Sequence, residues 1–342
     1  MIYDKILGCI MGAAVGDAMG SATEGYTLEQ IRKCFNGQVT EFQKPAADTF
    51  ANGNEAGQVT DDFSSFYFVA KAIADKNGQI DRVIICDALR KWSTHNDFFD
   101  RYATVATKVA FQRVFGEPLT FTYGIPTYPF QATNSAAIYS APIGLFHVGN
   151  IDKAIYDAAV AASVAYDNSL SISGACAVAA AISKAAESCS DLYSVISAGL
   201  YGAREGERLG KEMAHEAAGA SVVKRMELAI DLALSGNDCE SNMKQLADKV
   251  GCGPHVSETV PAAFGLLLIN AGNVMDTVFG GVNIGYDTDA IASIGGAIAG
   301  ALKGYGSIPS RYTNIIERIN SLHIIELASK IGEIIEPEKV GG

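Results

Sequence analysis

Residues 283–292 read Asn-Ile-Gly-Tyr-Asp-Thr-Asp-Ala-Ile-Ala. The small and apolar run from Ile291 to Leu302 predicts a buried helix, so Asp287 and Asp289 stand at its start. A helix N-terminus presents unpaired N–H groups and a partial positive charge, which an acidic side chain stabilises. Taken alone, the acidic pair therefore predicts a capped helix and nothing more.

A second helix of the same construction is predicted early in the chain. Asp61 and Asp62 follow Thr60 and precede the apolar run 63–70. If the fold brings both helix starts together, four carboxylates and a hydroxyl share a small volume, and their repulsion requires a cation or raised pKa values. Oxygen donors with no Cys or His nearby favour Mg²⁺ or Mn²⁺ over zinc. The two stretches together therefore predict a divalent metal site.

The two acidic stretches resemble the paired metal motifs of the ADP-ribosylglycohydrolases, the family that includes the enzyme removing ADP-ribose from nitrogenase reductase. Two further segments, 16–18 (Gly-Asp-Ala) and 141–144 (Ala-Pro-Ile-Gly), occur in family order, so the resemblance covers nearly the whole chain. It implies an all-α fold, a compact single-domain orthogonal helix bundle over residues 1–342. It also implies two magnesium or manganese ions.

The resemblance also implies roles for individual residues. Glu24 or Asp62 would receive the proton of the attacking water, although a lone Glu past a helix end is more often solvated. Asp100 would transfer a proton or bind ribose, and a solvated Asp at a helix start is the other interpretation. The expected metal ligands are Thr60, Asp61, Asp62, Asp287 and Asp289. The expected substrate-binding residues are Asn134, Ser135, Asn283 and Tyr286.

Several positions depart from the family pattern. Ala290 stands where the family usually has a metal-binding Thr, so one of the two metal sites should be weakened or missing. Tyr139 replaces an arginine of the family. Residues 131–133 carry side chains where a glycine-rich loop commonly approaches the diphosphate. These departures weaken the case for a full ADP-ribosyl substrate and leave the ribose-and-metal centre mostly intact.

Three functions therefore remain open. The first is a metal-dependent hydrolase of the N-glycosidic bond to ribose, acting on an ADP-ribosylated protein side chain. Such cleavage passes through an oxocarbenium-like sugar and needs a positioned water. The second is a hydrolase of a smaller N-riboside or nucleotide. The third is a non-catalytic binding or structural relative, because fold does not fix function.

Charge and cysteine content exclude some classes of protein. The net charge of −12 and the lack of any basic run argue against nucleic acid as a partner. The seven cysteines are scattered and lack Cys-x-x-Cys spacing, which predicts reduced thiols in a cytoplasmic protein. The apolar stretch from Ile6 to Met19 is short and interrupted by Asp17, so we expect neither a signal peptide nor a membrane partner.

Glycine recurs every four residues in two segments, one at the start of the chain and one in the late predicted helix. At this spacing the glycines lie on one helix face, where they let two backbones approach closely. We therefore expect a tight helix pair beneath the acidic site. The positions are Gly8, Gly12, Gly16 and Gly20, then Gly296, Gly300 and Gly304.

Two stretches are predicted to be loops. Residues 28–57 are mixed in composition and interrupted by glycines, a pattern that predicts a loop. Such a loop is suited to act as a lid. Residues 118–142 hold four of the nine prolines together with Tyr123, Tyr128 and Phe130, which predicts a structured loop rather than a helix. Its aromatic side chains either stack on a planar ligand or pin the loop to the core.

Overall fold

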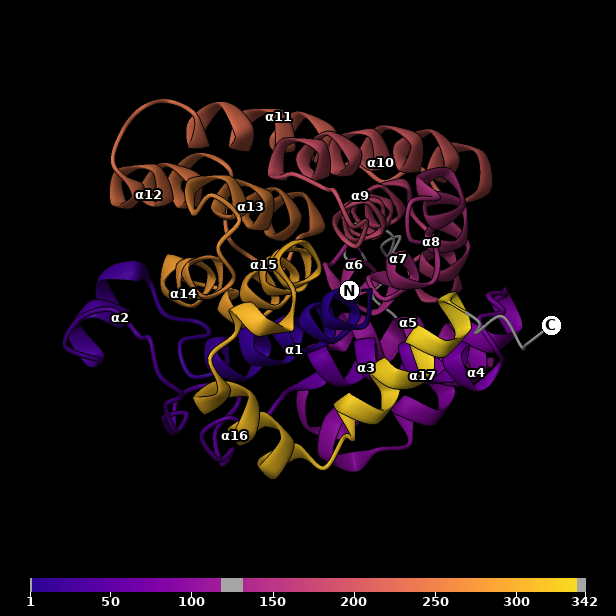
Figure 1. Cartoon of the computed structure of the whole chain (residues 1–342), viewed down its shortest axis with the longest axis horizontal. Helices are drawn as coiled ribbons and strands as arrows, with labels where there is room; N and C mark the ends of the chain where they lie inside the picture. Colours follow the sequence, from indigo (N-terminus) through magenta and orange to yellow (C-terminus); the bar gives the residue numbers. More distant parts are fainter. Residues whose placement is uncertain (1, 118–131, 337–342) are drawn as a thin grey trace.

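A computed structural model describes residues 2–117 and 132–336, and within those ranges every regular element is a helix (Figure 1). The all-α prediction is therefore confirmed. The early elements are α1 (Ile2–Gly20), α2 (Leu28–Cys34), α3 (Asp61–Asp75), α4 (Arg82–Ser93), η1 (Asn96–Asp100), α5 (Val105–Phe115), α6 (Ser135–Ser140) and α7 (Ile143–Phe146). The later elements are α8 (Ile151–Ala165), α9 (Ser169–Ala185), α10 (Leu192–Met213), α11 (Val222–Ala233), α12 (Cys239–Lys249), α13 (Val256–Ile269), α14 (Val274–Ile284), α15 (Thr288–Lys303), η3 (Tyr305–Ser307), α16 (Ser310–Asn320) and α17 (Ile324–Ile335).

The first helix and the late acidic helix, α1 and α15, pack side by side in the middle of the molecule (Figure 1). The predicted glycine contact between them is confirmed. A Cβ on Gly12 would lie 2.2 Å from the carbonyl oxygen of Gly296, and one on Gly16 would lie 2.2 Å from that of Ala292. Only glycine permits this approach, because any side chain would occupy the partner backbone.

Helices on either side bury this central pair. Helices α10 to α13 lie on one side of it in Figure 1, and α3, α4, α16 and α17 lie on the other. Helix α9 is buried along nearly its whole length and packs against α8 and α10. Its Ala- and Ser-rich composition suits that position, because small side chains let it contact neighbours on several faces.

Parts of both predicted loops are helical. Residues 28–57 contain α2, whose N-cap Thr27 forms a capping box with Gln30. Within 118–142, residues 118–131 lie outside the described part of the chain, with Tyr123, Tyr128 and Phe130 among them. The rest of that stretch contains α6, so the loop prediction was wrong there. The four prolines of the stretch lie outside residues 135–140, so proline does not interrupt this helix.

Among the helices in the described part of the chain, none combines the length and the apolar character that a membrane crossing requires.

Candidate metal centre

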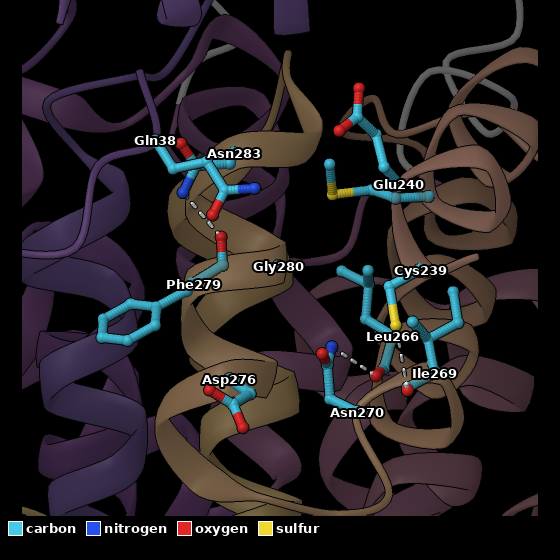
Figure 2. A pocket seen from close by; sticks show the side chains of 11 residues that line it. Gln38, Cys239, Glu240, Leu266, Ile269, Asn270, Asp276, Phe279, Gly280 and Asn283 are labelled. Carbon is cyan, nitrogen blue, oxygen red and sulfur yellow. Dashed lines mark hydrogen bonds between the residues drawn. The ribbon is translucent and has the colours of Figure 1, made fainter. Parts of the chain in front are cut away.

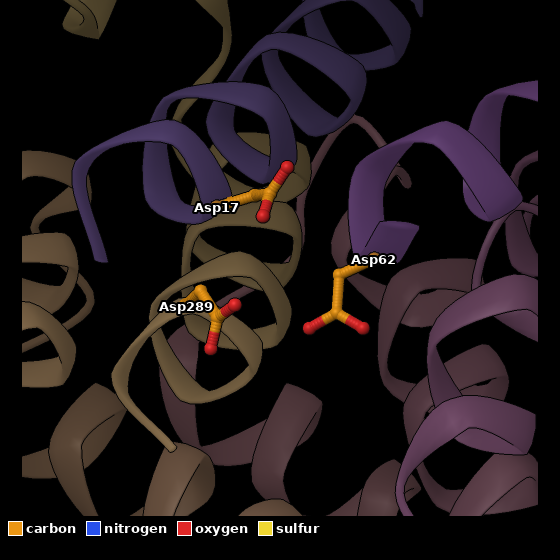
Figure 3. A group of neighbouring side chains, drawn as sticks. All are labelled: Asp17, Asp62 and Asp289. Atoms are coloured by element: carbon orange, nitrogen blue, oxygen red, sulfur yellow. The ribbon is translucent and has the colours of Figure 1, made fainter. Parts of the chain in front are cut away.

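The two acidic helix starts meet, and the end of α1 joins them. Asp17 in the last turn of α1, Asp62 in the first turn of α3 and Asp289 in the first turn of α15 converge on one space (Figure 3). Each offers a carboxylate oxygen, and these oxygens lie within 4.8 Å of one another. Three helices therefore supply one carboxylate each to a single small volume.

A second acidic group shares a member with the first. Glu24, Asp287 and Asp289 also place carboxylate oxygens within 4.8 Å of one another. Asp289 thus belongs to both groups and lies between them. The two acidic groups are therefore adjacent and joined by one carboxyl group, and either could hold a cation.

Backbone hydrogen bonds hold the late acidic stretch in place. The N–H of Tyr286 donates to the carbonyl of Tyr26 at 2.8 Å, and the N–H of Gly25 donates to the carbonyl of Tyr286 at 2.7 Å. The N–H of Asp287 donates to the carbonyl of Cys252 at 3.0 Å. The chain just after α1 and the chain before α13 therefore fix the start of α15.

Burial raises the pKa of every carboxyl of the cluster, and repulsion between the carboxyls raises the pKa of all of them except Asp289. Loss of hydration is the largest cause, and it raises the pKa of Asp61 to about 7 and that of Asp289 to about 6. Repulsion from Asp289 adds to the effect on Asp61. In four further groups the pKa is raised well above its ordinary value. Burial is the largest cause in each, and repulsion from Asp289 is the second. These groups are Asp17, Glu24, Asp62 and Asp287.

These residues fit a hard divalent cation. All the donors are oxygens, which suit Mg²⁺ or Mn²⁺. A cation would also offset the repulsion that raises the pKa values. Thr60 adds a buried hydroxyl that is hydrogen-bonded to Asp17.

The cluster forms one wall of a cavity of about 170 Å³. Asn134 and Ser135, at the start of α6, line it beside the acidic groups. The amide of Asn134 donates to Thr259 at 3.0 Å and to the carboxylate of Asp287. Asn134 is therefore oriented by the acidic wall, and Ser135 lies beside it. The lining includes Glu24, Gly25, Phe50, Asp61, Asp62, Tyr102, Thr104, Thr107, Thr133, Pro254, Tyr286, Asp287 and Asp289.

Two of the expected site residues lie elsewhere. Asp100 is the last residue of η1, is exposed and does not line the cavity, whereas Thr104, four residues on, does. Asn283 lines a separate cavity of about 250 Å³ between α12, α13 and α14 (Figure 2). Its amide pairs with the backbone of Val39, accepting from the N–H and donating to the carbonyl at 2.8 Å each. Asn283 therefore anchors the 38–39 loop.

Sequence reasoning missed Asp17 as part of the cluster. Its side chain is 0 % exposed, in a helix whose other buried residues are almost all small or apolar. An acidic residue in the last turn also opposes the helix dipole, which favours basic groups there. Both features could have marked Asp17 as functional. Phe50 and Tyr102 also line the cavity, and nothing local in the sequence singles them out.

Comparison with known proteins identifies the family of this chain. The family described as ADP-ribosylglycohydrolase matches residues 1–339. The chain is 28% identical over 339 residues to the uncharacterized protein YegU of Escherichia coli, covering 97% of this chain and 98% of that protein. It is 24% identical over 331 residues to the ADP-ribosylarginine hydrolase Tri1 of Serratia proteamaculans, covering 93% of this chain and 78% of the relative.

The fold agrees with these sequence matches. A solved structure described as an ADP-ribosylglycohydrolase-related protein complex aligns with a TM-score of 0.67 at 20% identity, covering 98% of this chain and 99% of that one. This structural likeness establishes the fold. The sequence match to the family model over nearly the whole length establishes family membership. The chain therefore belongs to the ADP-ribosylglycohydrolase family.

Proposed function

We propose that this protein is a metal-dependent hydrolase that cleaves an N-glycosidic bond to ribose. The observation that carries the proposal is the convergence of five carboxyl groups on one cavity, four of which belong to two acidic groups that share Asp289. So many acidic groups in a partly buried space are costly without a cation. Their position on a cavity wall, rather than in the core, suits a role in binding and catalysis.

The proposed metal ligands are the residues that the sequence also indicated, with Asp17 added. They are Asp17, Thr60, Asp61, Asp62, Asp287 and Asp289. A divalent ion bound there would neutralise the carboxylates, orient ribose hydroxyls and polarise groups near the reacting carbon.

The remaining lining residues have roles that their chemistry supports. Glu24 and Asp62 are the proposed proton acceptors for the attacking water, because each carboxyl lies at the cavity and accepts protons more readily than an exposed one. Asn134 and Ser135 provide an amide and a hydroxyl that can hold sugar oxygens. Asp100 does not line the cavity, so it would act only if η1 moved toward the cavity.

The names of two relatives suggest the first substrate to test. Both are ADP-ribosylarginine hydrolases, so we propose ADP-ribosylated arginine as the reference substrate for this chain. A non-catalytic relative of the family is the competing proposal.

The experiment combines metal binding with turnover. Calorimetry would measure Mg²⁺ and Mn²⁺ binding, and release of ADP-ribose from ADP-ribosylated arginine would report hydrolysis. We expect Asp61→Ala and Asp289→Ala to lose both metal binding and hydrolysis. Asp231→Ala, which removes an exposed acid on α11, is the control and should change neither. Wild-type protein that binds no divalent ion, or unchanged turnover in both site variants, would overturn the proposal.

A further inference from the structure

Asn54 is a buried polar residue whose side chain is only half satisfied. It is 0 % exposed. Its amide oxygen accepts from the hydroxyl of Tyr102, whereas its amide nitrogen has no hydrogen-bond partner among the described residues. A buried donor without a partner destabilises a fold, and a leucine of similar size would avoid that cost. Stability alone therefore does not explain an asparagine at this position, which points to its contact with Tyr102.

The loop that carries Asn54 is fastened to the segment between η1 and α5. The guanidinium of Arg101 donates to the backbone carbonyl of Asn52, and the hydroxyl of Tyr102 donates to the side chain of Asn54. Gly53 has a φ of +89°, and a Cβ on it would lie 3.1 Å from Nη2 of Arg101. Two residues of the loop thus hold two consecutive residues of the segment, and this pairing fixes the place of Tyr102.

Tyr102 lines the cavity beside the acidic cluster. The guanidinium of Arg101 lies over its ring, 5.0 Å from the centroid, and so supports one face of the ring. Burial is the main cause that raises the pKa of its phenol to about 12, and Asp17 and Asp61 also raise it. The hydroxyl is therefore protonated at neutral pH and lies within electrostatic reach of the cluster.

The contact with Asn54 decides what the Tyr102 hydroxyl can do for a ligand. A phenol has one proton to donate, and its oxygen can also accept. Because the proton is directed at Asn54, the oxygen has only acceptor positions left. A ligand must therefore offer it an O–H or N–H group. An ADP-ribosylated arginine offers both, in the hydroxyls of the ribose and in the N–H groups of the guanidinium.

We propose that Asn54 is a positioning residue that fixes the proton of Tyr102, so that the oxygen of Tyr102 accepts a hydrogen bond from the ADP-ribosyl substrate. This inference rests on the proposed hydrolysis and adds one residue that binds the substrate and one that orients it. The contact is compatible with a divalent ion at the cluster. A ribose hydroxyl can coordinate an ion through a lone pair and donate its proton to Tyr102 at the same time, and coordination makes it a stronger donor.

The two residues are tested together in a double-mutant cycle. Tyr102→Phe keeps the ring and should raise KM for ADP-ribosylated arginine about tenfold, with kcat within about twofold, because one uniform binding contact is lost. Asn54→Leu should raise KM about threefold, because the oxygen of Tyr102 remains but is no longer oriented. The double variant should match Tyr102→Phe alone, since Asn54 acts through Tyr102. Additive effects on KM would show that Asn54 does not act through Tyr102 and would overturn the inference.

Thermal midpoints separate positioning from a purely structural role. The double variant removes both polar partners, so its midpoint should be no lower than that of the wild type although its KM is raised. Tyr312→Phe is the matched control, because it removes a hydroxyl that donates to the carbonyl of Thr40 at 2.8 Å and does not line the cavity. It should lower the midpoint and leave KM unchanged. Equal rises in KM in Tyr312→Phe and Tyr102→Phe would count against the inference.

The choice of ligand identifies the group that donates to Tyr102. If a ribose hydroxyl is the donor, Tyr102→Phe weakens the binding of free ADP-ribose in Mg²⁺ as much as it raises KM. If the guanidinium is the donor, only KM for ADP-ribosylated arginine changes. Both results support the inference. A lower affinity for Mg²⁺ itself in Tyr102→Phe would instead place the tyrosine oxygen on the ion and overturn it.

Turnover separates this inference from the proposed function. ADP-ribose binding without any hydrolysis, weakened in Tyr102→Phe and Asn54→Leu, would support the inference and overturn the hydrolase. Hydrolysis of ADP-ribosylated arginine with wild-type KM in both variants would keep the hydrolase and overturn the inference. A wild-type protein that neither binds ADP-ribose nor hydrolyses ADP-ribosylated arginine would overturn both.

Discussion

Thr60 directs both of its hydrogen-bond donors at Asp17. Its N–H lies 2.8 Å from Oδ2 of Asp17, and its hydroxyl lies 2.5 Å from Oδ1. The same hydroxyl accepts from the N–H of Asp62 at 3.3 Å. A hydroxyl has one donor and two acceptor positions, so one lone pair of Thr60 remains for a ligand. Asp17 therefore orients Thr60 and ties the end of α1 to the start of α3.

Replacing Asp17 tests this orientation. Asp17→Ala should weaken Mg²⁺ binding by about 10- to 100-fold, because Thr60 loses the acceptor that fixes its hydroxyl and the cluster loses one carboxylate. Calorimetric titration of Mg²⁺ measures the change. Asp231→Ala provides the control with the same loss of charge at an exposed position. Equal affinity in wild type and Asp17→Ala would exclude Asp17 from the metal centre.

The raised pKa values predict how stability depends on pH when divalent ions are removed. Each carboxyl with a pKa above its unfolded value of about 4 stabilises the fold fully below that value, and this contribution is lost as pH rises through the folded pKa. For Asp289 the loss extends from about pH 4 to about pH 6, and for Asp61 from about pH 4 to about pH 7. With a chelator present, the thermal midpoint should therefore be higher at about pH 5 than at about pH 8.

Saturating Mg²⁺ should abolish or reverse this pH trend, because a bound cation favours the ionised carboxylates. Thermal denaturation at both pH values, with chelator and with Mg²⁺, measures it. An Asp61→Asn variant in chelator should show a smaller difference between the two pH values. The same decline in stability with and without Mg²⁺ would contradict a cation at the cluster.

The shared position of Asp289 predicts different effects for two single substitutions. Asp289→Asn removes a carboxylate from both acidic groups, whereas Glu24→Gln removes one from a single group. Asp289→Asn should therefore eliminate all divalent binding, and Glu24→Gln should leave one binding event intact. Titration of Mn²⁺ followed by its paramagnetic signal counts the ions bound. Identical stoichiometry in the two variants would show that the groups do not act as two sites.

Ala290 offers a substitution that should improve binding. Its side chain is buried, 1 % exposed, beside Asp289, and its N–H donates to Oδ1 of Asp289 at 2.9 Å. Ala290→Thr adds a hydroxyl beside Asp289, at the position where the resemblance to the family implies a metal-binding Thr, so we expect tighter binding of a second ion. Calorimetry in Mg²⁺ compares the two proteins. Ala290→Ser, which adds the hydroxyl with less bulk, should give the same gain; unchanged affinity in both would place residue 290 outside the metal shell.

The glycine contact between α1 and α15 predicts a large loss of stability on adding one methyl group. Gly12→Ala would place a Cβ 2.2 Å from the carbonyl oxygen of Gly296, and separating the two helices should cost about 1–3 kcal/mol or more. Gly332→Ala in α17 is the matched control. Its Cβ would meet no atom closer than 3.9 Å, so it should stabilise by about 0.5–1 kcal/mol through helix propensity. Urea unfolding measures both, and a neutral Gly12→Ala would contradict the close packing.

Local pattern in the sequence predicted the helices that carry the site and the tight contact beneath it. The four-residue recurrence of glycine in α1 and α15 marks one face of each helix, and a face of this kind is a property of the chain alone. The acidic starts at Asp61 and Asp289 were equally visible, because a helix start is signalled by a polar residue before an apolar run. Their resemblance to family motifs supplied the expectation that these two starts meet.

Only the tertiary structure decided which polar groups join them. Asp17 lies in the middle of an apolar run, and its partner Thr60 is 43 positions away, so their hydrogen bonds depend on how α1 packs against α3. Asn283 is only four residues from Asp287, yet its amide pairs with Val39 in another cavity, because residues on opposite sides of the turn before α15 face different neighbours. Sequence spacing fixes which residues share a helix face, whereas the contacts of a side chain are set by the segments that the fold packs around it.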